Sequence, residues 1–306
     1  MEILYFFESI RNTFCDVFFS FITLFGEETM FLLLVMLLLW CVDKRAGYYL
    51  SVVGFVGIFL NQSLKMTFRV PRPWVLDPEF TIVESAREAA TGYSFPSGHT
   101  QSAVGAFGTL ALWDKRKWVK IVSAALVVLV PVSRMYLGVH TFNDVIISTV
   151  IALVLVAAFY FLFCRVDAAS AAVGITLGCV AVFGICVILY LSLASFPADV
   201  DSANLKSSLE GTAKLFGAVV GMIVGWFVDK KFLRYEVKAV WYAQILKFVL
   251  GVLLVFAVKE LSRPVFAFLP EIPADGVRYF FIVLFGLVVW PMTFRFFSKM
   301  GKKQSA

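Results

Sequence analysis

Long apolar runs recur along the whole chain, and they constrain its fold more than any other feature. A helix needs roughly 20 residues to cross a bilayer. Runs that approach or exceed this length lie near 29–43, 47–65, 98–114, 117–138, 143–164, 170–195, 212–229, 240–260 and 277–297. Charged residues, only 16% of the 306 residues, gather between the runs and are too few to cover a soluble globule. We therefore predict an all-α protein, a polytopic transmembrane helical bundle.

The first stretch, residues 3–25, is harder to assign because Glu8, Arg11 and Asp16 interrupt its apolar residues. A tenth crossing and an interfacial or re-entrant helix both remain open. We expect no cleavable signal peptide, since Glu2 and the other early charges do not fit the basic and then apolar order of a leader.

Basic residues in the short loops give the predicted orientation. Under this topology one face collects Lys44, Arg45, Lys115, Arg116, Lys117, Lys120, Arg165, Lys230, Lys231, Arg234, Lys238, Lys299, Lys302 and Lys303. By the positive-inside rule this face is cytoplasmic, and the loops 66–97, 133–142, 196–211 and 261–276 lie outside. The sequence fits a bacterial plasma membrane, since it shows no eukaryotic targeting signal. The same juxtamembrane charges account for the net charge of +6, so it does not indicate nucleic-acid binding.

The cysteine and glycine patterns concern packing. The five cysteines lie in or next to apolar runs without a CxxC pair, so we interpret them as packing residues and expect no zinc site. Gly217, Gly221 and Gly225 recur on one helical face, a spacing that lets helices approach closely in lipid. Packing within the chain and a homodimer seam are both compatible with this spacing.

Three polar clusters interrupt the apolar runs. The first contains Lys65, Arg69 and Arg72, and Lys65 is followed after six residues by Arg72. Either Lys65 or Arg69 alone would suit a snorkelling anchor. Arg72 differs, because Pro71 and Pro73 fix the backbone on both sides and suit its guanidinium to phosphate binding.

The second cluster is Ser97-Gly98-His99, at the start of an apolar run. Gly98 lets the backbone approach a ligand, and a helix that begins here points free amides and its positive dipole end at an anion. Ser97 by itself would serve as a helix N-cap. His99 adds a group that titrates near neutral pH, which a cap does not need.

The third cluster is Ser133-Arg134, with His140 and Asp144 downstream. On a helix His140 and Asp144 share one face, so the carboxylate can accept the Nδ1 proton and leave Nε2 as a nucleophile. An ordinary ion pair at a helix start is the alternative. Together the clusters hold three candidate phosphate-binding cations, Lys65, Arg72 and Arg134, and the only two histidines of the chain, which suits phosphoryl transfer. No cluster of Asp and Glu suited to magnesium accompanies them, so we expect neither a metal nor a cofactor.

The three clusters resemble, in order and spacing, the signature motifs of the type 2 phosphatidic acid phosphatase (PAP2) superfamily: Lys65-x6-Arg72-Pro73, Pro96-Ser97-Gly98-His99 and Ser133-Arg134-x5-His140-x3-Asp144. The resemblance implies that His140 is the nucleophile that forms a phosphohistidine, with Asp144 as its orienting partner. His99 would be the general acid that later activates water. The phosphate would be bound by Lys65, Arg72, Ser97, Gly98 and Arg134.

The resemblance also implies an organisation and an activity. A six-helix core would cover residues 1–168, and residues 169–306 would form a C-terminal extension of about four transmembrane helices with an unspecified role. Bacterial members dephosphorylate phosphatidate, phosphatidylglycerophosphate or polyprenyl diphosphates at the outer face of the plasma membrane. The loop from Trp74 to Ser94, with Glu84, Arg87 and Tyr93, is either a roof that selects the headgroup or a plain connector.

Three alternatives stay open. The same site would serve a phosphotransferase that hands the phosphoryl group to another lipid or a sugar. A related pocket binds vanadate in haloperoxidases, although those resemble soluble proteins. A lipid or ion transporter usually places its ionisable groups near mid-membrane, whereas here they gather at one rim.

Overall fold

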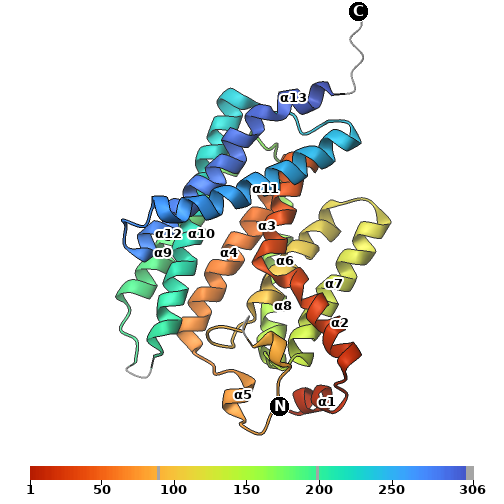
Figure 1. The fold of residues 1–306 in the computed structure, drawn as a ribbon, viewed down its shortest axis with the longest axis vertical. Helices are drawn as coiled ribbons and strands as arrows, with labels where there is room; N and C mark the ends of the chain where they lie inside the picture. The colour runs from red at the N-terminus through yellow and green to blue at the C-terminus, as the bar shows by residue number, and fades with distance from the viewer. Residues whose placement is uncertain (88–89, 198–199, 301–306) are drawn as a thin grey trace, which may run out of the picture. The chain divides into compact units, whose positions relative to one another are not determined.

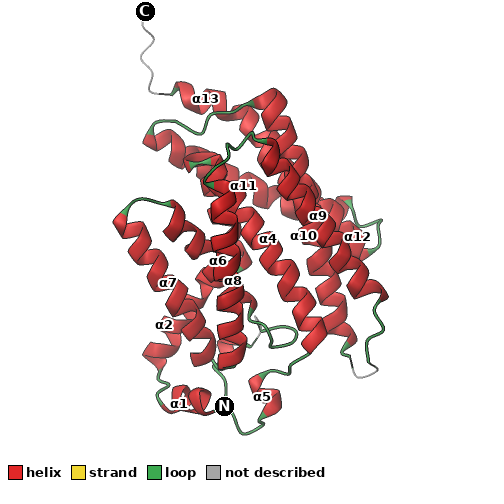
Figure 2. Ribbon diagram, turned by 180° about the vertical axis from the view of Figure 1, so that it is seen from behind, coloured by secondary structure: helices red, strands yellow, loops and turns green. Residues whose placement is uncertain are grey.

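The computed structural model describes residues 1–87, 90–197 and 200–300, and these residues form helices and loops without strands (Figure 2). The predicted cytoplasmic residues Lys302 and Lys303 lie outside them. In chain order the α-helices are α1 (Glu2–Ser9), α2 (Thr13–Thr23), α3 (Glu28–Leu37), α4 (Lys44–Phe68), α5 (Pro73–Leu76), α6 (Gly98–Trp113), α7 (Lys117–Tyr136), α8 (Phe142–Phe163), α9 (Ala171–Leu193), α10 (Ser202–Val228), α11 (Trp241–Val265), α12 (Glu271–Leu284) and α13 (Phe294–Lys299). Short 3-10 or π turns occupy η1 (Leu24–Gly26), η2 (Leu38–Val42), η3 (Glu84–Ala86), η4 (Asp229–Leu233), η5 (Phe285–Val289) and η6 (Trp290–Thr293).

Seven of the nine predicted crossings are confirmed as helices long and apolar enough to span a bilayer. The exceptions lie at 29–43 and 98–114. α6 has 16 residues, which at 1.5 Å per residue makes about 24 Å, less than a hydrocarbon core of roughly 30 Å. The other exception belongs to a bent pair, Thr13–Gly26 and Glu28–Val42, which meet at 52° and pass the same test only together. The chain is a multi-span membrane protein, with seven such helices in its described part, or eight if the bent pair is one span.

The first stretch is broken into two short helices. α2 starts anew after α1 because the side chain of Asn12 accepts a hydrogen bond from the Cys15 amide at 3.0 Å, as an N-cap does. Between the two helices, Arg11 donates to the Tyr136 carbonyl at the end of α7. One of the charges that interrupt the apolar pattern therefore fixes this stretch to α7, and residues 3–25 form no long helix of their own.

The described chain divides into two compact units. Unit 1 comprises Met1–Leu32, Val53–Leu162 and Leu189–Ser208, and it contains all three polar clusters. Unit 2 comprises Leu33–Val52, Phe163–Ile188 and Leu209–Ala306, and it contains most of the C-terminal helices. The domain boundary at residue 168 stays a prediction.

In unit 1 the helices pack closely, and α8 buries one of its faces. α6 packs against α7, which also contacts α2 (Figure 1). On α8, Val145, Ser148, Ala152 and Val156 recur every three or four residues and are buried. Large apolar side chains on its other faces are exposed, such as Val154 at 61%. This arrangement suits helices that meet through small residues and present apolar ones to lipid.

In unit 2 the glycine stripe packs α10 against the segment that begins with α12. A Cβ at Gly217 would collide with the carbonyl oxygen of Gly276, and one at Gly221 would lie 2.7 Å from another carbonyl oxygen of α12. At Gly225 it would lie 2.6 Å from Leu287. Packing within the chain therefore accounts for the glycine spacing, and the face that a homodimer seam would need is covered by this packing.

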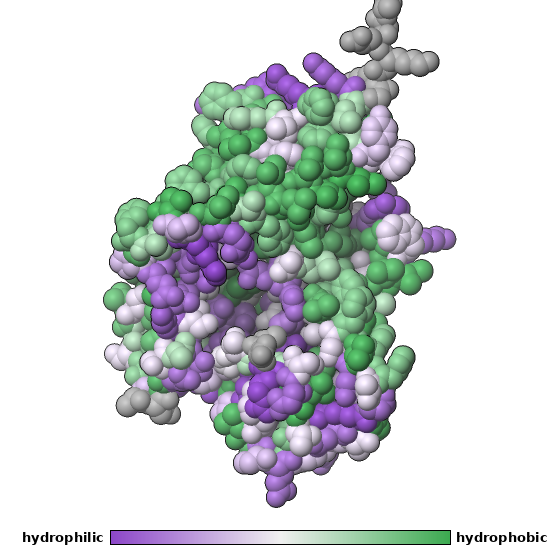
Figure 3. Space-filling view, in the orientation of Figure 1, coloured by the Kyte–Doolittle hydropathy of each residue, from purple (hydrophilic) through white to green (hydrophobic). Residues whose placement is uncertain are grey.

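α11, also in unit 2, has a largely exposed surface, in contrast to the packed glycine face of α10. Little of its most apolar stretch is buried, and large side chains such as Leu253 and Leu261 are more than half exposed. Figure 3 shows the resulting band of apolar side chains along this helix. A helix that is apolar around most of its circumference and yet exposed fits contact with lipid.

Candidate active site

The structure places all eight predicted site residues in unit 1, at the ends of its helices and in the turn between α7 and α8. They are Lys65, Arg72, Ser97, Gly98, His99, Arg134, His140 and Asp144. α4 ends after Phe68 because Arg69 adopts a left-handed backbone, with φ of 49°. The guanidinium of Arg69 donates to the Met66 carbonyl at 2.9 Å, so Arg69 caps the helix and is no part of the site.

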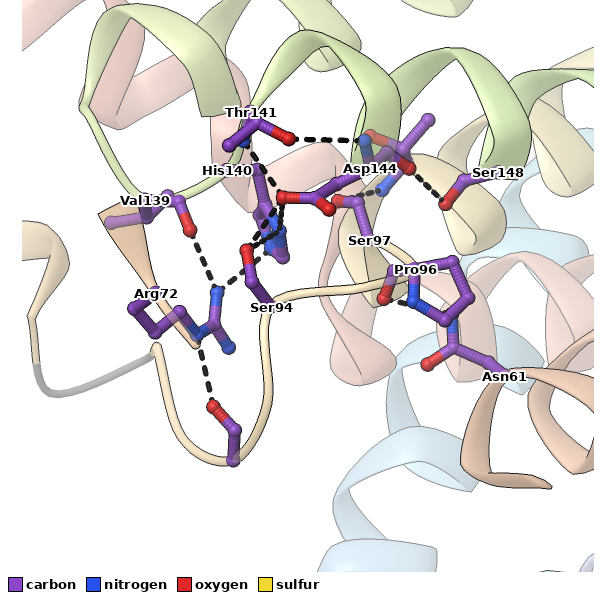
Figure 4. A network of polar contacts seen from close by, with 12 residues as sticks. Asn61, Arg72, Ser94, Pro96, Ser97, Val139, His140, Thr141, Asp144 and Ser148 are labelled. Atoms are coloured by element: carbon purple, nitrogen blue, oxygen red, sulfur yellow. Dashed lines mark hydrogen bonds and ion pairs between the residues drawn. The ribbon is translucent and has the colours of Figure 1, made fainter. Parts of the chain in front are cut away.

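Arg72 is held rigidly by carbonyl oxygens and is only 6% exposed. Its Nε donates to the Gly92 carbonyl at 3.0 Å and its Nη2 to the Thr91 carbonyl at 2.6 Å. Nη1 donates to the Val139 carbonyl at 2.9 Å. The loop before α6 and the turn after α7 thus fix the guanidinium beside His140 (Figure 4).

His140 lies in the turn between α7 and α8 and is 2% exposed. Nη1 of Arg72 is 3.0 Å from His140 Nε2. Because a guanidinium can only donate, Nε2 accepts and a neutral ring carries its proton on Nδ1. Burial, followed by the charges of Arg72, Arg134 and Lys65, lowers the pKa of His140 well below its ordinary value. The ring is therefore neutral at neutral pH, with the lone pair on Nε2.

Ser94 bridges Asp144 and His140, which the sequence analysis pairs directly. Asp144 Oδ2 is 3.6 Å from His140 Nδ1, beyond a normal hydrogen bond. The Ser94 hydroxyl donates to Asp144 Oδ2 at 2.5 Å and lies 3.4 Å from His140 Nδ1. The Thr141 amide donates to the same carboxylate oxygen at 2.7 Å. In this geometry the carboxylate acts on the imidazole largely through Ser94 (Figure 4).

The second cluster forms the start of α6. The Ser97 hydroxyl accepts from the Thr100 amide at 3.4 Å, which fits the N-cap alternative for this residue. A Cβ added at Gly98 would meet only Asn61 Oδ1, at 3.7 Å. His99 Nε2 is buried and has no hydrogen-bond partner within the described ranges. A buried polar atom left without a partner at a helix N-terminus suits an anionic ligand.

The two remaining cations also act on His140. Arg134 is 1% exposed, and its Nη1 donates to the Thr23 hydroxyl of α2 at 2.8 Å. Its Nε is buried without a partner among the residues described. Lys65 lines a polar cavity together with Thr91 and other residues. Three positive charges around a neutral histidine form a site that a phosphate group would neutralise.

Ser94, Thr91 and Thr23 complete the site and do not appear among the sequence predictions. Ser94 and Thr91 come from a loop, where residues follow no period that would indicate a shared face. Thr23 lies in the apolar stretch of α2, and nothing in its sequence neighbourhood indicates a role for its hydroxyl. The role is visible only in the fold, where Arg134 donates to it. The proximity of Ser94 to the second cluster is the single signal that was present.

The predicted roof loop separates into two parts. Glu84 and Arg87 bond to each other at the surface, with Nε to Oε2 at 2.8 Å, and Arg87 also lies over the Trp74 ring. Tyr93 lines the polar cavity, and its hydroxyl accepts from the Asp201 amide at 3.3 Å. The end of the loop therefore lines the cavity beside the site, and its start approaches the site through the Trp74 ring, 5.9 Å from Cζ of Arg72.

The fold and the site together define a class, a multi-span membrane protein with a buried histidine among fixed cations. Across residues 1–87, 90–197 and 200–300, no group of three or more His, Cys, Asp or Glu side chains converges as metal ligands would. The chain belongs to the PAP2 superfamily. Residues 45–167 match the PAP2 superfamily model, and residues 213–303 match that of the PAP2 superfamily phosphatase transmembrane extension.

The curated relatives are named as lipid phosphatases. The chain is 31% identical over 164 residues to a probable sphingosine-1-phosphate phosphatase of Dictyostelium discoideum, covering 49% of this chain and 39% of the relative. It is 24% identical over 229 residues to sphingosine-1-phosphate phosphatase 2 of Mus musculus, covering 73% and 61%. It is 28% identical over 133 residues to undecaprenyl-diphosphatase BcrC of Bacillus subtilis, covering 42% and 65%. The chain thus spans less than two thirds of each of these relatives, and no solved structure gives a significant match.

Proposed function

We propose that this protein is a membrane phosphatase that hydrolyses a lipid phosphate or diphosphate ester through a phosphohistidine at His140. The observation that carries the proposal is the position of His140, with Nε2 3.0 Å from Arg72 and Nδ1 facing Ser94 and Asp144. Membership of the PAP2 superfamily and the names of the relatives support a lipid phosphatase activity.

In the first step, His140 Nε2 attacks the terminal phosphorus while the bond from that phosphorus to the leaving oxygen breaks. The leaving oxygen is the lipid oxygen in a monophosphate and the bridging oxygen in a diphosphate. The Nη1 group of Arg72 then donates its hydrogen bond to a phosphoryl oxygen instead of to His140 Nε2. Lys65 and Arg134 neutralise the charge on the other phosphoryl oxygens. The ring becomes cationic when the N–P bond forms. Asp144 stabilises that charge through Ser94, as an orienting carboxylate does in other histidine sites.

His99 serves the leaving group and then water. Its ring is neutral in the empty site, because burial and the charge of Arg134 lower the pKa of His99 well below its ordinary value. Its Nε2, which has no partner within the described chain, takes a proton from the bound phosphate monoanion and gives it to the leaving oxygen. In the second step His99 takes a proton from water, the oxygen attacks phosphorus, and the N–P bond breaks. Inorganic phosphate leaves, and His140 is again neutral. Fixed cations stabilise the phosphoryl charge, so the proposed reaction requires no metal ion.

We further propose that the site faces the outer side of a plasma membrane, because the short basic loops fall on the opposite face. Cysteine labelling tests this orientation after the native cysteines have been replaced. Glu79→Cys should react with a membrane-impermeant maleimide in intact cells, and Lys117→Cys only after the cells are opened. The reverse pattern would place the site on the cytoplasmic side.

The experiment for the mechanism uses an aryl phosphate, whose leaving group needs no proton, together with a lipid phosphate. His140→Asn should lose at least about 10³-fold in phosphate release from both substrates, since it removes the nucleophile. His99→Asn should release one equivalent of aryl alcohol in a burst and then stall with an acid-labile phosphoryl group on the protein. Wild-type rates in His140→Asn would overturn the proposal, and an unchanged melting temperature confirms that each variant is folded.

A further inference from the structure

A polar cavity of about 50 Å³ in unit 1 lies beside the phosphate site. Its wall includes Lys65 from the end of α4, Thr91 and Gly92 from the loop before α6, and Asn204 and Ser207 from the first turns of α10. Lys65 is the only charged side chain among the described residues of this wall. Neutral hydrogen-bonding groups form the rest of the lining.

The cavity and the reaction centre share a wall. Arg72, whose Nη1 meets His140 Nε2, donates through Nη2 to the Thr91 carbonyl at 2.6 Å and through Nε to the Gly92 carbonyl at 3.0 Å. Lys65, on the same cavity, is one of the cations that lower the pKa of His140. In the proposed in-line attack the ester substituent leaves on the side of phosphorus that faces His99, and Lys65 acts on both histidines from the cavity wall. We therefore expect the substituent to lie near this cavity.

The start of α10 is held against the loop, so its side chains keep their place. The Asp201 amide donates to the Tyr93 hydroxyl at 3.3 Å, and the Asp201 carboxylate caps the turn by accepting from the Ala203 amide at 2.8 Å. Asn204 and Ser207 are three residues apart and share one helical face. Asn204 Oδ1 lies 3.9 Å from the position that a Cβ on Gly92 would take.

We propose that this cavity is a headgroup subsite, in which Asn204 and Ser207 recognise hydroxyl or amino groups on the carbons next to the phosphate ester. The inference rests on the proposed phosphatase function and narrows its substrate class. A second phosphate would bring further negative charge and call for more cations, whereas the described lining offers one. A plain hydrocarbon chain would leave the amide and hydroxyl groups without partners. The lining thus favours a polar lipid monophosphate over a polyprenyl diphosphate.

Three substrates and three variants test the subsite by phosphate release in detergent micelles. The substrates are octadecyl phosphate with a 2-amino and a 3-hydroxyl group, octadecyl phosphate without them, and a diphosphate of three isoprene units. The variants are Asn204→Ala, Ser207→Ala and, as matched control, Ser202→Ala, which is an exposed serine on the same helix outside the cavity wall.

The wild type should prefer the substituted phosphate over both others by about tenfold in kcat/KM. Asn204→Ala and Ser207→Ala should each lower kcat/KM for that substrate about three- to tenfold, corresponding to one neutral hydrogen bond. Both variants should keep kcat/KM for plain octadecyl phosphate within twofold of the wild type. Ser202→Ala should leave kcat/KM unchanged for both octadecyl phosphates. If Asn204 and Ser207 had a purely structural role, their replacement would lower kcat/KM equally for all substrates. That result would overturn the proposed subsite.

The outcomes separate the two proposals. Equal hydrolysis of all three substrates, unchanged in the variants, would overturn the headgroup subsite and leave the phosphatase intact. A preference for the diphosphate would overturn the proposed substrate class. Absence of phosphate release from every substrate by the wild type would overturn the phosphatase itself, and the subsite with it.

Discussion

Replacing Ser94 by Ala should slow the formation of the phosphoenzyme without unfolding the site. Ser94 donates to Asp144 Oδ2 at 2.5 Å and lies 3.4 Å from His140 Nδ1, so its hydroxyl is the main path from the carboxylate to the imidazole. Asp144 keeps the bond from the Thr141 amide at 2.7 Å in the variant. The Ser94 amide also keeps its bond to the Val70 carbonyl at 2.8 Å. We therefore expect the backbone to hold its shape.

The size of the effect follows from the charge that Asp144 carries. A hydrogen bond to a charged group contributes about 1.5–3 kcal/mol. At 1.36 kcal/mol per factor of ten, its loss corresponds to roughly a 10- to 150-fold decrease in kcat/KM. Asp144→Asn removes the charge itself, together with the acceptor for Ser94, and should cost at least as much.

A double-mutant cycle in kcat/KM separates this role from a structural one. If Ser94 acts through Asp144, adding Ser94→Ala to Asp144→Asn should cost less than about twofold, because the two side chains form one path. Ser85→Ala, an exposed serine in the same loop, is the control and should match the wild type. The reasoning fails if Ser94→Ala alone retains the wild-type kcat/KM, or if the two losses add in full.

Three further predictions concern the charge, the packing and the metal dependence of the protein. Nitrogen-15 spectra at pH 6 should show His140 as a neutral ring protonated at Nδ1, because its lowered pKa keeps the neutral form as pH falls below 6.5. A His99→Gln variant separates the two signals, and an imidazolium signal would contradict the prediction. Gly217→Ala should destabilise the protein by about 1–3 kcal/mol through overpacking, whereas Gly178→Ala, with nothing within 4 Å, should raise the melting temperature slightly or leave it unchanged. EDTA should leave kcat/KM unchanged, and restoration of a lost rate by added magnesium would overturn the metal-independent reaction.

Apolar length predicted most of the fold, and it failed where a helix is short or bent. The seven long helices stand out because lipid requires a continuous apolar run with every backbone bond satisfied. α6 is shorter than such a run, since the polar turn at Ser97 starts the helix late and Asp114 follows its end. The bend lies at Gly26-Glu27-Glu28, where a polar break separates the stretch 3–25 from the run 29–43, but hydropathy does not show that the two helices form one bent pair.

Some contacts of the site can be predicted from sequence spacing, and others appear only in the fold. His140 and Asp144 are four residues apart in sequence, so their proximity is predictable. The bridge between them is not, because Ser94 lies 46 residues before His140 in a loop and reaches it only through the tertiary fold. Thr23 is a similar case, since it meets Arg134 across 111 residues.

The charge balance of the site explains why this arrangement suits a phosphate ester in particular. Lys65, Arg72 and Arg134 bring three positive charges, and Asp144 returns one negative charge, while His140 stays neutral. Even when Glu27, which acts on Arg134, is counted, positive charge remains in excess, in a site where burial makes such an imbalance costly. A phosphate monoester carries about 1.5 to 2 negative charges at neutral pH. Binding one would remove the imbalance and would supply partners for the buried Nε atoms of His99 and Arg134. Binding of the substrate therefore also neutralises the site. The positive charges that stabilise the phosphoryl group are in position before the transfer begins.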